Sequence, residues 1–117
     1  MTVASKTVRV IGLEPFNRAL LERMPGAEEV RFRGLLDYAE VVRPPADGID
    51  FTGLLAAAER RLAESGTPTD GVIWYWDFPS SALGAVLAHR LGLPGPPLEA
   101  VAACQHKVWS RIEQARA

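Results

Sequence analysis

Residues 71–92 read GVIWYWDFPSSALGAVLAHRLG, which is a continuous apolar run, a polar loop and then an apolar helical pattern. The run at 71–76 has the length and the bulky residues of a strand that is covered on both faces. Apolar side chains then recur at helical spacing, at Leu83, Val86, Leu87 and Leu91, and Gly92 ends the pattern. This strand–loop–helix unit indicates an α/β protein with a mainly parallel sheet.

The N-terminal part repeats this organisation. The segment TVRVIGL at 7–13 alternates apolar and polar residues and predicts a strand. Pro15 suits the first turn of a following helix, because proline lacks the N–H that would be unpaired there. Phe16, Leu20 and Met24 form one apolar stripe on this helix, and we expect the stripe to lie on the sheet. A second, short strand is predicted over residues 28–32.

Residues 35–42 fit a short helix or a strand equally well. Pro44–Pro45 and Asp47–Gly48 then mark a loop. The next helix is clearer, with Asp50 as a natural N-cap and Gly66 as a natural residue after its end. Together these elements predict a Rossmann-like, three-layer α/β domain whose mainly parallel sheet has about four strands.

The last part of the chain begins with a Pro/Gly-rich connection, LGLPGPP at 91–97. Pro97 is expected to open a final helix, with Glu99 in its first turn. We therefore expect an α/β domain over residues 1–97 and a linker helix over residues 98–117. This division is typical of a chain that passes from one domain to the next.

Composition excludes several classes of protein. With 117 residues the chain has room for one domain, and its formal net charge of −1 offers no basic field for nucleic acid or an anionic membrane. The single cysteine, Cys104, cannot form an internal disulfide, and two distant histidines are a poor start for a zinc site. No apolar run has the length of a signal peptide core or a membrane span. We expect a cytoplasmic protein.

Candidate binding residues follow two predicted strands. Ligands of open parallel sheets bind at the carboxyl ends of the strands. The first such place holds Gly12 and Glu14, but its single glycine does not make a dinucleotide fingerprint. The second holds Asp77, Ser80 and Ser81 at the start of a helix, where a polar or anionic substrate group could bind. The simpler interpretation, which we favour on the residues alone, is that these three side chains cap the helix and turn the chain.

Other conspicuous residues are better explained by packing or solvation. Trp74 and Trp76 would share one face of a strand, opposite Tyr75, and are expected in the core. His89 falls on the polar side of its helix and is expected at the surface. Cys104 lies on a predicted apolar stripe with Val101, Val108 and Ile112, which favours an inert core thiol.

Lys107 and Arg111 are the strongest candidates for an anion site. Their spacing places both on one helical face, and none of the residues three or four positions away is a carboxylate. The two cations repel each other by about 0.2–0.5 kcal/mol when exposed. An anion bound between them would remove that cost. The alternative, in which water and salt screen the two charges and no ligand binds, fits the sequence equally well.

The segment LGLPGPPLEAVAACQHKVWSR at 91–111 resembles the junction between the N-terminal pre-ATP-grasp domain and the ATP-grasp module of carboxylate–amine ligases. Leu91–Pro96 of this chain matches the Leu-Gly-Leu-Pro-Gly-Pro segment of that family. Lys107 stands at the position of the family lysine that contacts ATP, and Arg111 stands at the basic position that follows. YWDFP at 75–79 is similar to one ATP-grasp subgroup. Gln105 departs from the pattern, because an acidic residue is usual there.

The resemblance implies a function for the complete enzyme. In this family ATP phosphorylates a substrate carboxylate and an amine attacks the acylphosphate, with Mg²⁺ neutralising charge on the phosphoryl group. It implies ATP as cofactor, with Lys107 and Arg111 as contacts, and a small carboxylate as substrate, bound by Gly12, Glu14, Asp77, Ser80 and Ser81. The adenine pocket and the Mg²⁺ ligands belong to an ATP-grasp module or a separate ATP-binding subunit. The 117-residue chain alone is expected to be inactive and to bind no metal.

Two other interpretations stay open. The chain could be a stand-alone α/β interaction module, or one subunit of a split ligase, that docks through its C-terminal helix. Val108, Trp109 and Ile112 would then form an apolar surface that a partner or a second copy covers. A receiver-like phosphorylation switch is disfavoured, because the first strand ends in Glu14 alone rather than in an acidic cluster.

Overall fold

The computed structural model describes residues 6–42 and 48–117. Three parallel strands form one sheet in the order β2-β1-β3. They are β1 (Lys6–Leu13), β2 (Val30–Asp37) and β3 (Gly71–Trp74). The α/β class and the parallel sheet are thus confirmed, with three strands in the described part of the chain rather than about four.

The ambiguous segment at 35–42 explains the difference in strand number. Its first half completes β2, which is much longer than the predicted strand over 28–32. Its second half is the short helix α2 (Tyr38–Val41), which begins where Asp37 and Glu40 form a capping box. Residues 35–42 therefore contain the boundary between β2 and α2 and do not form a further strand. The predicted loop at Pro44–Pro45 and Asp47 lies outside the described residues.

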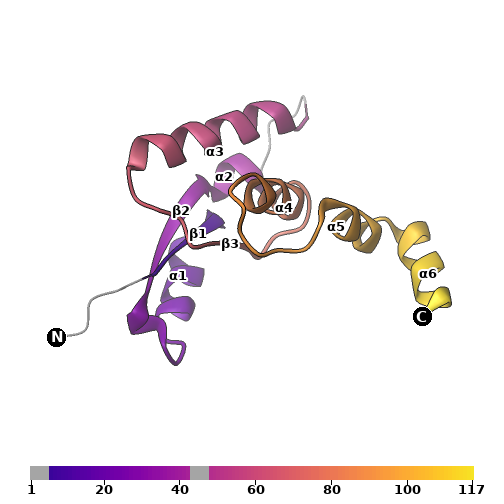
Figure 1. Ribbon diagram of the computed structural model, residues 1–117, viewed down its shortest axis with the longest axis horizontal. Coiled ribbons are helices and arrows are strands. Elements are labelled where there is room, and N and C mark those ends of the chain that lie inside the picture. Colours follow the sequence, from indigo (N-terminus) through magenta and orange to yellow (C-terminus); the bar gives the residue numbers. More distant parts are fainter. Residues whose placement is uncertain (1–5, 43–47) are drawn as a thin grey trace.

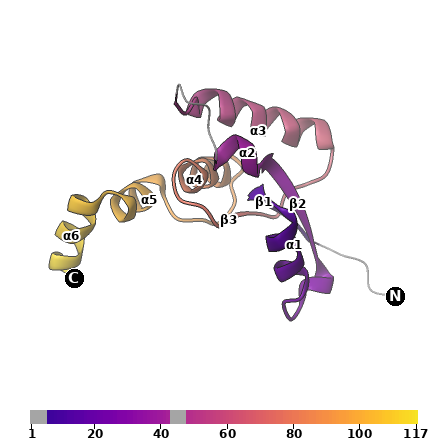
Figure 2. The same ribbon diagram turned by 180° about the vertical axis from the view of Figure 1, so that it is seen from behind.

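Helices cover both sides of the sheet. Figures 1 and 2 place α1 (Pro15–Glu22) on one side of the strands, and α3 (Phe51–Ser65) and α4 (Ser80–Arg90) on the other. A short 3₁₀ turn, η1 (Ala27–Glu29), leads into β2. As predicted, the Asp50 side chain accepts a hydrogen bond from the Gly53 N–H at the start of α3, and Gly66 ends the helix in the left-handed conformation.

The core lies between the sheet and the α3–α4 layer. Its fully buried members include Ile11 of β1, Leu36 of β2 and Leu83 of α4. The Trp74 ring packs so closely on Gly84 that a Cβ at this position would collide with it. As a result α4, which is the most buried helix of the described chain, is held directly against β3.

The predicted apolar stripe of α1 does not lie on the sheet. Phe16, Leu20 and Met24 are all exposed, and Leu21 is the buried residue of the helix instead. Arg18 fixes this rotation, since its Nη1 donates to the main-chain oxygen of Phe32 in β2 at 2.8 Å. The stripe prediction was wrong because one polar contact to the sheet determines which helix face turns inward.

The single C-terminal helix predicted from Pro97 is in fact two helices, α5 (Leu98–Gln105) and α6 (Lys107–Arg116). His106 separates them with an extended backbone, and its Nδ1 accepts a hydrogen bond from the Trp109 N–H at 3.2 Å. A histidine cap therefore starts a new helix where we expected a continuous one. Cys104 consequently shares no stripe with Val108 and is exposed, so the prediction of a core thiol was wrong.

Candidate functional site

The candidate site lies at the carboxyl edge of the sheet, where β1 and β3 end. Gly12 has a positive φ of 71°, and a Cβ there would lie 2.8 Å from Val41 Cγ2 and 2.9 Å from Trp76 Cδ1. Only glycine fits this conformation and this close approach. The indole Nε1 of Trp76 donates to the Gly12 main-chain oxygen at 3.2 Å, so the segment that follows β3 is joined to the end of β1.

Trp76 has this role because β3 is shorter than predicted. The strand ends at Trp74, which packs on the core, while Trp76 lies beyond it and meets Tyr38 of α2 edge-on, with 5.3 Å between ring centroids. We expected the two tryptophans on one face of a strand. This prediction was wrong, because Trp76 lies beyond the end of β3. The half-exposed Tyr75 lies between them in the chain. The sequence offered no signal for the Trp76–Gly12 hydrogen bond.

Glu14 is occupied as the N-cap of α1. Its Oε1 accepts from the Asn17 N–H at 2.7 Å, and its Oε2 accepts from the Phe16 N–H at 3.1 Å. Such capping satisfies two helix donors that would otherwise be unpaired. The pKa of the Tyr75 hydroxyl is raised, first by burial and then by the negative charge of Glu14. Glu14 thus contributes a negative charge to this edge, with both carboxylate oxygens already engaged.

The N-terminus of α4 follows Trp76 by four residues and has no side-chain cap. The Ser81 and Leu83 N–H groups donate to the main-chain oxygens of Asp77 and Pro79, at 3.3 and 2.9 Å. Asp77 is exposed, and Pro79 occupies the N-cap position. The capping interpretation that we favoured for Asp77, Ser80 and Ser81 is therefore not what the structure shows.

The two serines have different environments. Ser80 is fully buried, and its Oγ has no hydrogen-bond partner among the described residues. Ser81 is also buried, and its Oγ accepts a hydrogen bond from Nε2 of Gln105, the last residue of α5. Gln105, where an acidic residue was expected from the resemblance, thus ties α5 to the start of α4. This contact between distant helices could not be found from sequence spacing.

A stacked aromatic pair completes the surroundings. Phe78 stacks on Phe51 at the start of α3, with 6.0 Å between ring centroids and 11° between planes. The segment from Trp76 to Ser81 therefore contacts α2 through Trp76, α3 through Phe78 and α5 through Ser81. The candidate edge is a junction of several elements, with Gly12 joined to Trp76 and the charge of Glu14 acting on Tyr75.

Lys107 and Arg111 do not belong to this cluster. They lie on α6, which extends away from the domain beyond α5 (Figure 1). Both are exposed, and neither takes part in an ion pair within the described chain. Lys107 is the first residue of α6, so Ala103 and Cys104 are not its helical neighbours. His89 is exposed, as expected.

Residues 6–42 and 48–117 contain no group of three or more His, Cys, Asp or Glu side chains that could hold a metal ion. The Mg²⁺ that the family resemblance implies therefore finds no ligand set on the described part of this chain. Nor does this part contain a helix long and apolar enough to cross a membrane. No family model matches the sequence, and no curated protein and no solved structure shows significant similarity to it.

Proposed function

We propose that this chain forms the N-terminal, substrate-facing domain of an ATP-dependent carboxylate–amine ligase of the ATP-grasp type. The observation that carries the proposal is the start of α4, which has no side-chain cap and follows the segment that Trp76 joins to Gly12 of β1. Helix N-termini favour anions, because their N–H groups and the helix dipole point at the ligand. A substrate carboxylate is the anion that such a ligase activates.

The C-terminal segment supports the ATP-dependent part of the proposal. Lys107 and Arg111 lie exposed and without ion pairs in the described chain, on a helix that extends from the domain. In the proposed enzyme these cations contact ATP held by an ATP-grasp module or a separate ATP-binding subunit. ATP and Mg²⁺ supply the phosphoryl group and neutralise its charge. This chain contributes one wall of the substrate site and is inactive by itself.

The test uses the species that carries this sequence in its own host. Its intact mass shows whether the 12.7 kDa chain stands alone or is part of a longer polypeptide. ADP release is then measured with MgATP and a panel of carboxylates and amines, together with any copurifying ATP-binding subunit. We expect Asp77→Asn to lower the KM for the carboxylate, because it removes a negative charge beside the proposed anion site. Lys107→Ala should raise the KM for ATP.

Arg116→Ala is the matched control, because Arg116 lies on the same helix but pairs with Glu113 at 3.3 Å. It should change neither KM. If Lys107→Ala and Arg116→Ala behave alike, the assignment of Lys107 to ATP is wrong. If no carboxylate stimulates ADP release by the native species, the ligase proposal is wrong.

A second candidate function is that of an interaction module that docks through its C-terminal helix. The exposure of Val108, Trp109 and Ile112, at 63%, 39% and 48%, favours it. An apolar helix face of this kind marks a surface for a partner or a second copy. Sedimentation of the 117-residue chain alone tests for a homodimer. Val108→Ser with Ile112→Ser should abolish association under this candidate without affecting the fold of the domain.

A further inference from the structure

A separate cavity opens between α3 and α4, with a volume of about 350 Å³. The cavity is lined by Thr67 and Thr69, which precede β3. It therefore lies at the amino edge of the sheet, whereas Gly12 and Asp77 lie at the carboxyl edge. Its volume falls within the range of about 300–1,000 Å³ that is typical of small-molecule sites. Most of its wall is apolar, formed by Leu62, Ala63, Leu87 and Leu91.

The polar end of the cavity is supported by a buried arginine. Arg9 of β1 is only 4% exposed, and its Nε donates to Thr69 Oγ1 at 3.2 Å. Its Nη2 donates to Ser65 Oγ at 2.9 Å and to the Thr67 main-chain oxygen at 3.3 Å. Because the Thr69 oxygen is already an acceptor, its hydroxyl hydrogen can be donated to a ligand.

Arg9 has no carboxylate partner within the described chain. Its hydrogen bonds all go to neutral oxygens, and its pKa is lowered, first by burial and then by the charge of Arg33. A buried cation without a counter-ion is costly. An anion that binds the Thr69 hydroxyl would therefore be stabilised by the positive charge of Arg9, which donates to the same hydroxyl.

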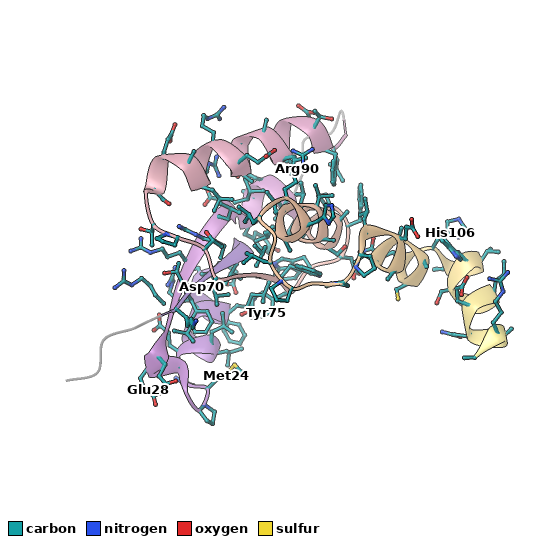
Figure 3. The ribbon with its side chains drawn as sticks, viewed as in Figure 1. Met24, Glu28, Asp70, Tyr75, Arg90 and His106 are labelled. Carbon is teal, nitrogen blue, oxygen red and sulfur yellow. The ribbon has the colours of Figure 1, made fainter. Side chains whose placement is uncertain are left out.

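An ion pair limits how much negative charge a ligand can carry. Arg90 of α4 pairs with Glu59 of α3 at 2.6 Å, and both residues line the cavity. Figure 3 labels Arg90 between these two helices. Glu59 would repel a dianionic phosphate more strongly than a group with a single charge. The apolar wall, in turn, suits a ligand with a hydrocarbon body.

We propose that this cavity binds a small amphipathic carboxylate. The hydrocarbon body lies against Leu62, Leu87 and Leu91, and the carboxylate accepts a hydrogen bond from the Thr69 hydroxyl in front of Arg9. The site is distinct from the substrate edge of the proposed ligase, and it does not depend on that function.

The probe for this site is hexanoate, titrated into the ¹⁵N-labelled 117-residue chain and followed by amide chemical shifts. We expect saturable shifts centred on Thr67, Thr69 and Leu91. Hexan-1-ol has the same hydrocarbon body without the charge, and it should bind about tenfold more weakly, as expected for loss of a charge-assisted hydrogen bond. Equal affinity for the two probes would overturn the carboxylate assignment.

Two variants of α3 locate the site. Ala63 lines the cavity, whereas Ala56 lies two turns earlier on the same helix and does not line it, and both are exposed. Ala63→Leu should weaken hexanoate binding at least tenfold by filling the cavity, while Ala56→Leu should leave it unchanged. An unchanged affinity in Ala63→Leu would show that hexanoate binds elsewhere and overturn the proposal.

Thr69→Val tests the hydroxyl. We expect it to remove the preference for hexanoate over hexan-1-ol while the binding of hexan-1-ol persists, which also shows that the variant is folded. If Thr69→Val keeps the tenfold preference, the hydroxyl is not the carboxylate donor and the proposed binding mode is wrong.

Discussion

Trp76 and Gly12, which are 64 residues apart in the chain, are joined by a hydrogen bond of 3.2 Å from the indole to the main-chain oxygen. The bond connects the segment after β3 to the end of β1, and the same indole would be only 2.9 Å from a Cβ of residue 12. The geometry of the candidate site at the carboxyl edge therefore depends on both residues. Four predictions test this junction and the rest of the fold.

Trp76→Phe removes the indole donor and keeps an aromatic ring against Tyr38. The Gly12 oxygen then lacks this partner, so we expect the free energy of unfolding to fall by about 1 kcal/mol or somewhat more. Denaturant unfolding followed by far-ultraviolet circular dichroism measures the change. Trp109→Phe on the exposed α6 is the control and should leave the midpoint unchanged. Equal effects of the two variants would contradict a specific role for Trp76.

Gly12→Ala should be the more costly of two glycine substitutions. Gly12 and Gly26 have similar positive φ angles, 71° and 84°, but only at Gly12 would the new Cβ meet other atoms within 4 Å. Gly26→Ala should cost about 1 kcal/mol from the backbone conformation alone. Gly12→Ala should cost about 1–3 kcal/mol more, because Val41 and Trp76 must shift. Denaturant unfolding of both variants checks the difference, and equal costs would show that the close packing is unimportant.

The Arg61–Glu40 ion pair predicts a loss of stability in acid. Arg61 Nη2 and Nη1 donate to the two carboxylate oxygens of Glu40 at 2.8 and 3.0 Å, and Nη1 also donates to the Leu35 main-chain oxygen. The hydrogen bonds from Arg61 lower the pKa of Glu40, against the opposing effect of burial. The stabilisation is therefore complete above the unfolded-state pKa of about 4.3 and is lost as pH falls through the lower folded-state pKa.

Glu40→Gln should reduce the free energy of unfolding at neutral pH by no more than about 1 kcal/mol, because the pair is partly exposed. The difference between variant and wild type should shrink as pH falls below 4. Urea unfolding at several pH values measures it. Glu28→Gln, at an exposed position without an ion pair in the described chain, is the control. A pH-independent difference for Glu40→Gln would contradict the assignment.

The exposed thiol of Cys104 should react with Ellman's reagent in the native protein. Because the thiol is accessible without unfolding, the native rate should be within about tenfold of the rate in denaturant. Absorbance at neutral pH follows the reaction. Protection of several orders of magnitude would support the buried thiol that the apolar stripe suggested, and it would contradict the break between α5 and α6.

The sequence predicted those elements whose signals are local. The alternation of TVRVIGL and the Asp50 and Gly66 caps belong to β1 and α3, and their positions are nearly as expected. Side-chain contacts that sequence patterns do not reveal determined the features that we predicted wrongly. The Arg18 contact to β2 set the rotation of α1, and the His106 side chain divided the last helix. No pattern within α1 or α5 carries that information.

Of the candidate site, only the meeting of two strand ends was predictable. The carboxyl ends of β1 and β3 do meet, because parallel strands present them at one edge. The roles of individual residues were not predictable. Glu14 is engaged in capping, Ser80 is buried and Ser81 pairs with Gln105, and each of these depends on how a helix packs in three dimensions.

The break at His106 allows the direction of α6 to change relative to α5. A helix of ten residues is about 15 Å long. In the described chain its packing contacts are chiefly with α5, so the main-chain torsions of one residue set its direction. A rotation of about 20° there would carry the far end of α6 by about 5 Å. Small torsional changes at His106 therefore displace Arg116, at the far end of the helix, by several ångströms while Lys107 stays nearly in place.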